Sequence, residues 1–297
     1  MKSGHSFSFC PVCGSLKYKK VFIYRHFRYV RCKHCHLIWM NPLVKTDSTA
    51  DDYENIDWNS YYRFLSDFRR RQFEKDMALI KKVGPRKGRL LDIGTGTGEF
   101  LKVASEHGFM AYGIEPSRRA SEKASGFGPV LRSEFETLSF KENFFDVVTL
   151  WSVLEHVTHP TQFLKKIHGL LKKDGLLALR LPLGSSLINF LCLGAYKFSG
   201  QRLAGPLRQF YQLDWEGRHF FLFSEASLNL LLEKTGFQPF WKKKESGFNV
   251  TTLKYRLTFK PGNWLFEKIL EMFAALSLFL AHLLKKEDEI VLFARKI

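Results

Sequence analysis

The stretch Leu90-Leu91-Asp92-Ile93-Gly94-Thr95-Gly96-Thr97-Gly98-Glu99-Phe100 decides the fold of this chain. Its first residues are apolar and follow Arg89, which is typical of a short buried strand. Glycines then occupy every second position from 94 to 98, and apolar residues at helical spacing follow. Glycine adopts backbone angles that other residues avoid and allows a ligand to approach the backbone closely. The N-terminus of the following helix offers unpaired N–H groups to a polar or anionic group, so the stretch predicts a strand, a ligand-binding loop and a helix.

A second segment supplies an acid at a matching place. Residues 110–114 predict another strand, and Glu115 closes it. Dinucleotide-binding folds space their glycines as G-x-G-x-x-G, whereas here the third glycine comes one residue earlier and Asp92 precedes the first. This variant resembles motif I of class I S-adenosylmethionine (SAM) dependent methyltransferases. The resemblance implies that the glycine loop holds the methionine part of SAM and that Glu115 binds the ribose hydroxyls.

A further strand and the residues after it extend the resemblance. Residues 144–151 predict a buried parallel strand, and Leu154-Glu155-His156-Val157 follows at its carboxyl end, where open α/β sheets bind ligands. This segment, with Pro160 after it, is similar to methyltransferases of the ubiquinone type and of glycolipids or sugars. A helix is expected over 161–173 and a strand over 176–181, after a turn at Asp174-Gly175. The resemblance then covers residues 84–182 and implies an α/β, Rossmann-like seven-stranded sheet with helices on both faces.

The resemblance also assigns site residues. The cofactor site is expected to contain the glycine loop, the two acids, an adenine-lining segment and the end of the fourth strand: Asp92, Gly94, Thr95, Gly96, Gly98, Glu115, Glu134, Phe135 and Trp151. For the segment at 134–135, a plain exposed loop stays open as the alternative.

Two histidines are the catalytic candidates. His156 follows the fourth strand, and a histidine titrates near working pH, so we expect it to be the general base. His219 is the second candidate, facing the acceptor, with a packed or exposed histidine as the alternative. Relatives that methylate quinone precursors carry a further acid three residues before the Glu-His pair, for a metal ion. Ser152 occupies that position here, so we expect no catalytic metal.

The N-terminal segment carries two cysteine pairs. Cys10-Pro11-Val12-Cys13 and Cys32-Lys33-His34-Cys35 are separated by residues 14–31. This spacing predicts a zinc ribbon in which Cys10, Cys13, Cys32 and Cys35 hold a structural Zn²⁺, because four thiolates leave no open position for a substrate. The aromatic and β-branched residues of 17–30 predict a hairpin between the pairs.

The charge of the chain limits its partners. Forty-six basic residues against 29 acidic ones give a net charge of +17, which favours nucleic acid, a membrane surface or a phosphorylated substrate as partner. A basic protein without such a partner is the alternative. The ribbon has no acid before Asp47, and its interleaved aromatic residues either bind nucleic acid or form the ribbon's own core. We favour the second interpretation.

The length suffices for one sizeable domain and a small module. We expect a zinc ribbon at 1–45, a linker and covering helix at 46–83, and a SAM-binding methyltransferase domain at 84–297. An insertion at 183–217 is expected to cap the acceptor. A second insertion, 253–286, contains an apolar run too short to span a bilayer. Residues 264–284 either pack internally or form an interfacial helix, with Trp264, Phe266, Phe273 and Phe279 in lipid.

The sequence therefore predicts a SAM-dependent methyltransferase acting on a small-molecule, lipid-linked or glycan acceptor, at oxygen or nitrogen. The alternatives are an RNA methyltransferase that recognises its substrate through the basic ribbon, and a SAM-binding protein without catalysis. The first eight residues lack the apolar core of a signal peptide, and the cysteines do not form a secreted disulfide framework. We expect a cytoplasmic location, with peripheral membrane contact left open.

Overall fold

A computed structural model describes residues 6–44, 66–214, 217–247, 250 and 264–297. The chain divides into two compact units. One unit comprises Met1–Asp47, Leu181–Leu230 and Lys243–Val291, and is called the ribbon unit below. The other comprises Ser48–Arg180, Leu231–Lys242 and Leu292–Ile297, and is called the sheet unit. The linker expected at 47–57 lies outside the described residues, and the expected domain boundaries stay a prediction.

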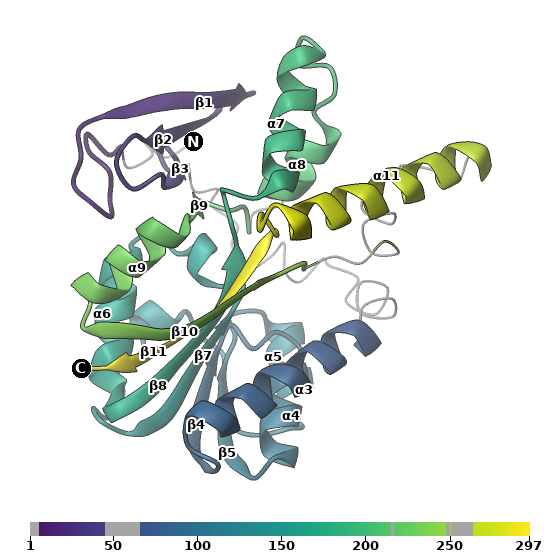
Figure 1. The fold of residues 1–297 in the computed structure, drawn as a ribbon. Helices are drawn as coiled ribbons and strands as arrows, with labels where there is room; N and C mark the ends of the chain where they lie inside the picture. Colours follow the sequence, from purple (N-terminus) through teal and green to yellow (C-terminus); the bar gives the residue numbers. More distant parts are fainter. Residues whose placement is uncertain (1–5, 45–65, 215–216, 248–249, 251–263) are drawn as a thin grey trace. The chain divides into compact units, whose positions relative to one another are not determined.

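A seven-stranded sheet in the order β10-β11-β8-β7-β4-β5-β6 forms the core of the sheet unit (Figure 1). Strand β4, which is the apolar start of the glycine stretch, lies inside the sheet next to the middle strand β7, and pairs in parallel with β5 on one side and β7 on the other. This is the seven-stranded sheet that the sequence predicted. The strands are β4 (Gly88–Ile93), β5 (Phe109–Ile114), β6 (Val130–Leu131), β7 (Phe145–Trp151), β8 (Leu171–Pro182), β10 (Phe237–Glu245) and β11 (Glu289–Lys296).

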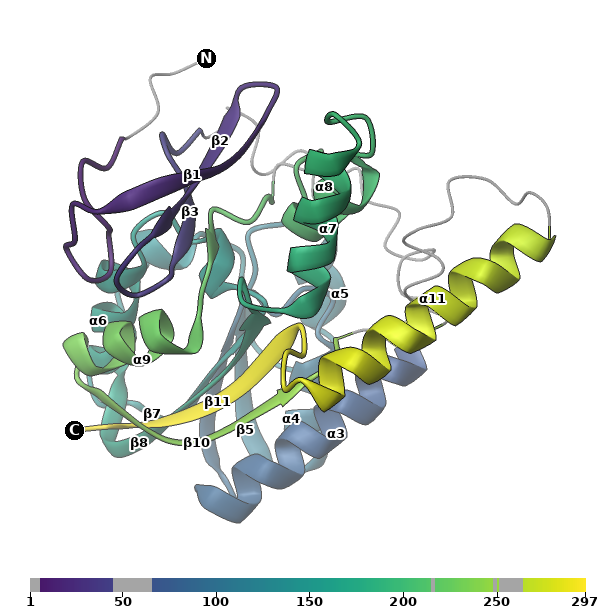
Figure 2. The same ribbon diagram turned by 45° about the horizontal axis from the view of Figure 1, so that its top comes forward.

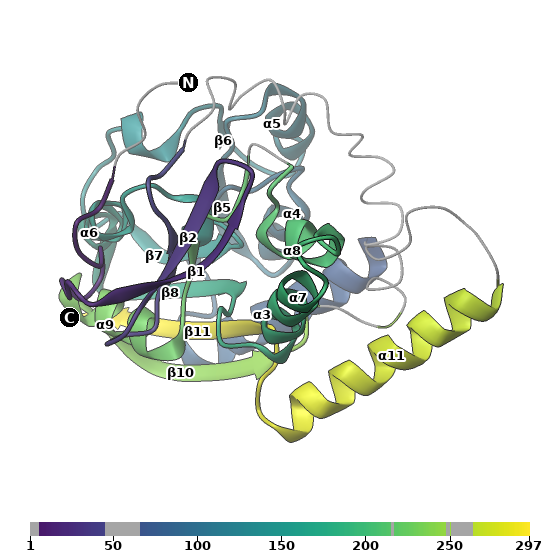
Figure 3. The same ribbon diagram turned by 90° about the horizontal axis from the view of Figure 1, so that it is seen from above.

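The helices between the parallel strands cover both faces of the sheet. Helices α4 (Glu99–Glu106) and α5 (Arg118–Ala124) connect β4 to β5 and β5 to β6, towards one edge of the sheet. Helix α6 (Pro160–Leu170) connects β7 to β8, towards the other edge. Right-handed crossovers then place α6 on the face opposite α4, as Figure 3 shows. Because the order reverses between β4 and β7, ligands are expected at the carboxyl ends of these strands.

Helix α3 (Ser66–Val83) lies against α4 on the same face of the sheet. The rings of Phe73 and Phe100 meet edge to face with centroids 5.4 Å apart. The first part of the helix expected from residue 59 lies outside the described residues. The described part brings an aromatic side chain to the helix that follows the glycine loop.

One boundary differs from the expectation. The helix expected to reach Lys173 ends at Leu170, and β8 begins at Leu171. Asp174, with a φ of 60°, and Gly175 form an irregularity inside β8 where its register with β7 shifts, instead of a turn before the strand. Leu170 and Leu171 are both buried, and Leu171 pairs with Phe145 of β7, so packing of these residues overrides the turn signal.

The ribbon unit contains a second sheet, in the order β1-β2-β3-β9. Strands β1 (Tyr18–Tyr24) and β2 (Phe27–Cys32) form the expected hairpin, and β3 (Ile38–Met40) follows the second cysteine pair. The fourth strand, β9 (Phe221–Leu222), comes from a much later part of the sequence. It pairs antiparallel with β3, with Ile38 opposite Leu222. The ribbon sheet is therefore completed by the segment that follows the expected cap insertion.

Aromatic rings fill the space beside this sheet. Phe22 stacks on Tyr29 with centroids 4.8 Å apart, and the ring of Tyr211 meets both edge to face at 4.8 Å. All three side chains are buried. Phe22 and Tyr29 therefore belong to a core that is shared with Tyr211 of the cap insertion, whereas from the sequence we favoured a core made by the ribbon alone.

Four helices complete the description. Helices α7 (Leu187–Phe198) and α8 (Gly205–Tyr211) lie in the expected cap insertion, and α11 (Trp264–Leu283) lies in the second insertion and contacts α7. Helix α9 (Glu225–Lys234) runs across the boundary between the two units. Among the helices of the described ranges, none combines the length and the apolar character that crossing a membrane requires.

Candidate functional site

Glu115 and the glycine loop meet at the carboxyl ends of β5 and β4. The backbone N–H of Gly96 donates to Glu115 Oε2 at 2.9 Å, and the N–H of Ser117 donates to Oε1 at 3.0 Å. The side chain of Glu115 is only 6% exposed. Both carboxylate oxygens are therefore held by backbone donors at the edge of the loop, which fixes the position of this acid.

The loop requires glycine at its first and last positions. Gly94 and Gly98 have φ values of 69° and 86°, in the left-handed region that favours glycine. A Cβ on Gly94 would lie 2.7 Å from Val153 Cγ2, and one on Gly98 would lie 2.8 Å from the Cα of Ala124. The loop therefore packs so closely against Val153 and Ala124 that neither position has room for a side chain. That the loop holds the methionine part of SAM stays a prediction.

Asp92 closes β4 directly before the loop. Its carboxyl group is buried and accepts a hydrogen bond from Thr149 Oγ1 of β7 at 2.7 Å. Burial raises the pKa of Asp92 to about 7, against the opposing effect of the hydrogen bonds. The carboxyl group can therefore change its protonation state near neutral pH.

The end of β7 places Trp151 and His156. The ring of Trp151 meets Phe100 edge to face at 4.9 Å. Ser152 has a φ of 58°, unusual for a residue with a side chain, and donates its N–H to Arg180 O at 2.9 Å. His156 ends a short 3-10 helix, Leu154–His156, with its Nε2 atom 3.9 Å from the buried carboxylate of Glu155. A partly exposed imidazole thus lies beside a buried acid at the ligand-binding edge.

The two residues that were expected to line the adenine differ in solvent exposure. Glu134 is exposed, directly before the 3-10 helix Phe135–Thr137. The ring of Phe135 is buried against Phe163, with centroids 4.8 Å apart, and Lys166 Nζ donates to the Phe135 carbonyl at 2.7 Å. Phe135 therefore contributes to packing against α6.

His219 lies in the ribbon unit. It is buried, its N–H donates to Tyr211 O at 3.1 Å, and its carbonyl accepts from Tyr29 Oη at 2.7 Å. The other predicted catalytic and cofactor-binding residues lie in the sheet unit: Asp92, Gly94, Thr95, Gly96, Gly98, Glu115, Glu134, Phe135, Trp151 and His156. All of these role assignments stay predictions.

Sequence reasoning missed a buried ion pair in the sheet unit. Arg180 Nη2 of β8 donates to both carboxylate oxygens of Asp76 of α3, at 2.9 and 3.0 Å. The two side chains are 4% and 3% exposed. An arginine inside the apolar segment 176–183 could have signalled a buried partner, but nothing in the sequence around Asp76 indicates that it is the one.

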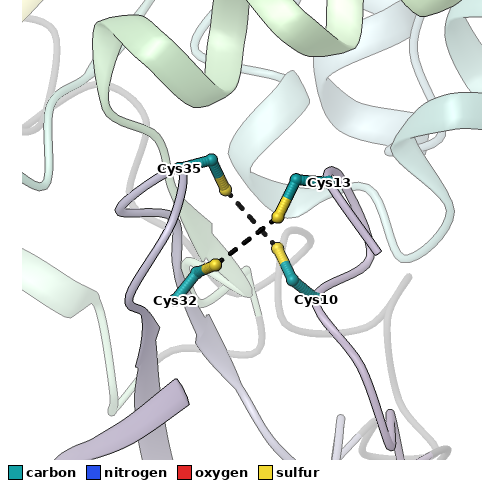
Figure 4. Close-up of side chains that lie close together, drawn as sticks. All are labelled: Cys10, Cys13, Cys32 and Cys35. Carbon is teal, nitrogen blue, oxygen red and sulfur yellow. Dashed lines mark hydrogen bonds between the residues drawn. The ribbon is translucent and has the colours of Figure 1, made fainter. Parts of the chain in front are cut away.

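The four cysteines converge on one point, as Figure 4 shows. All four Sγ atoms lie within 4.8 Å of one another, and the pairs Cys10–Cys35 and Cys13–Cys32 are 3.5 Å apart. Tetrahedral zinc, with Zn–S bonds of about 2.3 Å, places its sulfurs about 3.8 Å apart. None of the chain's cysteines forms a disulfide. The cluster can therefore hold a metal ion, whereas His34 and His36 are exposed.

These features define the class. A sheet of this strand order, with a glycine loop after its central strand and an acid at the end of the next, is the fold of class I SAM-dependent methyltransferases. A family model described as a methyltransferase domain matches residues 59–240. The chain belongs to this methyltransferase family.

Individual similarities agree with the family. The chain is 29% identical to a ubiquinone biosynthesis O-methyltransferase of Bradyrhizobium diazoefficiens over 120 residues, 38% of this chain and 47% of that protein. It spans just under half the length of the curated relatives that it matches.

Solved structures show the same fold at low identity. A SAM-dependent methyltransferase of Thermotoga maritima, described as a possible histamine N-methyltransferase, aligns with a TM-score of 0.54 and 21% identity. The alignment covers 84% of this chain and 99% of that one. Magnesium protoporphyrin IX methyltransferase from Synechocystis aligns with a TM-score of 0.54 and 14% identity, over 84% of this chain and 97% of that one.

Proposed function

We propose that the protein transfers a methyl group from SAM to a small-molecule, lipid-linked or glycan acceptor, at oxygen or nitrogen. The observation that carries the proposal is the hydrogen bond from Gly96 N–H to Glu115 Oε2, 2.9 Å long, because it brings the two motifs of the donor site together. In this proposal the glycine loop holds the methionine part of SAM and Glu115 binds the ribose hydroxyls. Asp92, Thr95 and Trp151 line the site, and Glu134 and Phe135 face the adenine.

The transfer is an in-line displacement. A lone pair of the acceptor attacks the methyl carbon, and the bond from that carbon to the sulfonium sulfur breaks with its electron pair going to sulfur. Catalysis then depends mainly on holding donor and acceptor close, aligned and away from water. A neutral oxygen or nitrogen acceptor also loses a proton, which His156 accepts in this proposal and becomes imidazolium. Glu155, 3.9 Å from its Nε2 atom, stabilises that charge.

Four further assignments belong to the proposal. The ion held by Cys10, Cys13, Cys32 and Cys35 is Zn²⁺, with a structural role, since four thiolates complete its coordination. His219 faces the acceptor as the second catalytic candidate. The protein is cytoplasmic, and its acceptor side is formed by the insertion 183–217.

RNA methylation is the second candidate function. The exposed basic residues of the hairpin favour it, because such residues bind phosphates: Lys17, Lys19, Lys20, Arg25 and Lys33. Against it, the hairpin aromatics Phe22, Phe27 and Tyr29 are buried, so they offer no surface on which bases could stack.

Binding and transfer are measured separately. Glu115→Ala is expected to weaken SAM binding about tenfold or more in calorimetry, since it removes a charged hydrogen-bond acceptor. Glu122→Ala is the matched control, because Glu122 is exposed on α5 and pairs only with Arg118 on the same helix. Equal SAM affinity in the two variants would contradict the donor site.

Transfer is tested with methyl-labelled SAM, the purified full-length protein and an extract of the cells that produce it. Label in the lipid or soluble fraction supports the first function, and label in RNA supports the second. His156→Ala is expected to lower turnover without changing SAM affinity; loss of both would contradict its role as base. If the protein binds SAM but no fraction acquires label, the result supports the alternative of a SAM-binding protein without catalysis.

A further inference from the structure

Helix α11 turns its large apolar side chains outward. Its buried positions are occupied by small residues, namely Ala274, Ser277 and Ala281. Leu278 is half-buried. Eight large apolar residues are between 37% and 72% exposed: Ile269, Met272, Phe273, Leu276, Phe279, Leu280, Leu283 and, directly after the helix, Leu284. These eight residues are called the apolar stripe below.

The stripe follows from helix geometry. At about 100° per residue, the eight exposed apolar residues fall within an arc of about 140°, and the three small buried residues fall outside this arc, on one side of it. A surface helix of a globular protein normally buries its apolar stripe against the core and exposes the other face. In α11 the arrangement is reversed, so packing against the described part of the chain does not account for the eight large residues.

Neighbouring parts of the ribbon unit extend the apolar surface. The N–H of Leu187, at the start of α7, donates to Lys286 O just after α11, at 2.9 Å. Figure 2 shows α11 extending away from this junction, with most of its length beyond α7. Phe190, one turn into α7, is 71% exposed. An exposed apolar surface of this kind marks a contact with a partner or a membrane.

Basic residues lie at the ends of these two helices. Lys285 and Lys286 follow α11 directly, and Lys197 lies in the last turn of α7; all three side chains are exposed. Arg202, in the loop after α7, is exposed as well. Apolar side chains bordered by cations match the interface of a membrane with anionic headgroups, where each nearby cation contributes about 1 kcal/mol.

We propose that the apolar stripe of α11 docks the protein on the surface of an anionic membrane, with the helix lying in the plane of the interface. The aromatic and aliphatic residues enter the headgroup and acyl boundary, while Lys285 and Lys286 bind lipid phosphates. The side chains of Trp264 and Phe266, which one alternative from the sequence placed in lipid, lie outside the described residues. The proposal is independent of methyl transfer, because docking requires neither SAM nor an acceptor.

The test is vesicle co-sedimentation of the full-length protein without SAM. The vesicles contain phosphatidylcholine alone or an equal mixture of phosphatidylcholine and phosphatidylglycerol. We expect binding to the mixed vesicles that weakens as salt rises, and a decrease of about tenfold or more in the double variant Met272→Glu/Phe279→Glu. Met110→Glu is the matched control, since Met110 is a 56% exposed methionine of β5, in the sheet unit.

Each other outcome overturns the proposal. Equal binding by the stripe variant and the wild type would mean that another surface docks. Equal binding to both kinds of vesicle would overturn the role of the lysines, which the variant Lys285→Glu/Lys286→Glu tests directly. Absence of vesicle binding, together with a dimer in sedimentation that the stripe variant dissociates, would assign the stripe to a second copy of this chain. SAM affinity is measured on the same samples, so that a failure of the docking proposal is distinguished from a failure of the donor-site proposal.

Discussion

The contacts that stabilise the sheet unit internally differ in kind from those that stabilise the ribbon unit. In the sheet unit the central strands β4 and β5 are consecutive, and each connects to its neighbour through one helix, so short stretches of sequence specify the arrangement. In the ribbon unit Tyr29 Oη donates to the carbonyl of His219, 190 residues away, and Ser224 Oγ donates to Cys35 O at 2.6 Å across 189 residues. Local motifs therefore specify the donor side, whereas the ribbon unit depends on contacts between distant segments.

The contacts of the ribbon unit also indicate which segments the cysteine cluster stabilises. Cys35 belongs to the cysteine cluster, and its carbonyl anchors Ser224 just after β9. Strand β9 in turn pairs with β3, which directly follows the second cysteine pair. The cluster thus supports the segment that carries His219, in addition to the hairpin itself.

The largest expected effect comes from removing the metal. Cys32→Ser, or a chelator, is expected to unfold the ribbon sheet, because structural zinc in small modules contributes on the order of 10 kcal/mol. Hydrogen exchange should then lose protection in β1, β2, β3 and β9, while β4, β5 and β7 keep theirs and SAM affinity is retained.

Cys192→Ala serves as the control for this experiment. Cys192 is a buried free cysteine of α7, in the same unit but outside the cluster. Its variant should keep the protection of β1, β2, β3 and β9. Simultaneous loss of protection in β4 and β7 on metal removal would contradict the independence of the two units.

A smaller effect is expected from breaking the buried ion pair between Asp76 and Arg180 of the sheet unit. Asp76→Ala leaves the buried guanidinium of Arg180 without its carboxylate and is expected to lower the free energy of unfolding by about 3–5 kcal/mol. Urea unfolding followed by circular dichroism measures it. Glu106→Ala is the control, because its pair with Arg70 is exposed and contributes less than about 1 kcal/mol. Equal effects of the two variants would mean that the sheet unit does not depend on this distant contact.

The smallest effect concerns pH. Burial raises the pKa of Asp92 to about 7, above the value near 4 of an unfolded aspartate. The folded state therefore binds this proton more tightly, so its contribution to stability is fully present below pH 4 and is lost as pH rises towards 7 and beyond. About two pKa units of this shift fall between pH 5 and 8, which at roughly 1.4 kcal/mol per unit gives about 2.8 kcal/mol. The wild type should lose about half of this free energy of unfolding, roughly 1.4 kcal/mol, because buried sites respond with a high effective dielectric constant.

Asp92→Asn is expected to remove this part of the pH dependence, because the amide does not titrate and still accepts the hydrogen bond from Thr149. Urea unfolding at pH 5 and pH 8 provides the comparison. Burial also raises the pKa of Asp288 to about 7, so a residual slope should persist in the variant. An unchanged slope would exclude Asp92 as its source.

The sequence by itself determined the sheet, the glycine loop and the cysteine cluster. Each depends on a pattern within about 40 residues: a buried apolar run, glycines where φ is positive, or two paired thiols. The prediction that Glu115 lies beside the loop also followed, because parallel strands carry their carboxyl ends to the same edge of a sheet. The helix boundary at Lys173 was wrong, because burial of Leu170 and Leu171 overrode the turn signal.

Only the tertiary structure decided the contacts between distant segments and the direction of the helix faces. The pairing of β9 with β3 and the ion pair between Arg180 and Asp76 join residues that are far apart in the sequence, so no local sequence pattern predicts these contacts. Helix α11 was predicted, but its apolar pattern is the same whether the large side chains pack inward or face outward. In the structure α11 contacts α7, its buried residues among those described are Ala274, Ser277 and Ala281, and eight of its large apolar residues are exposed.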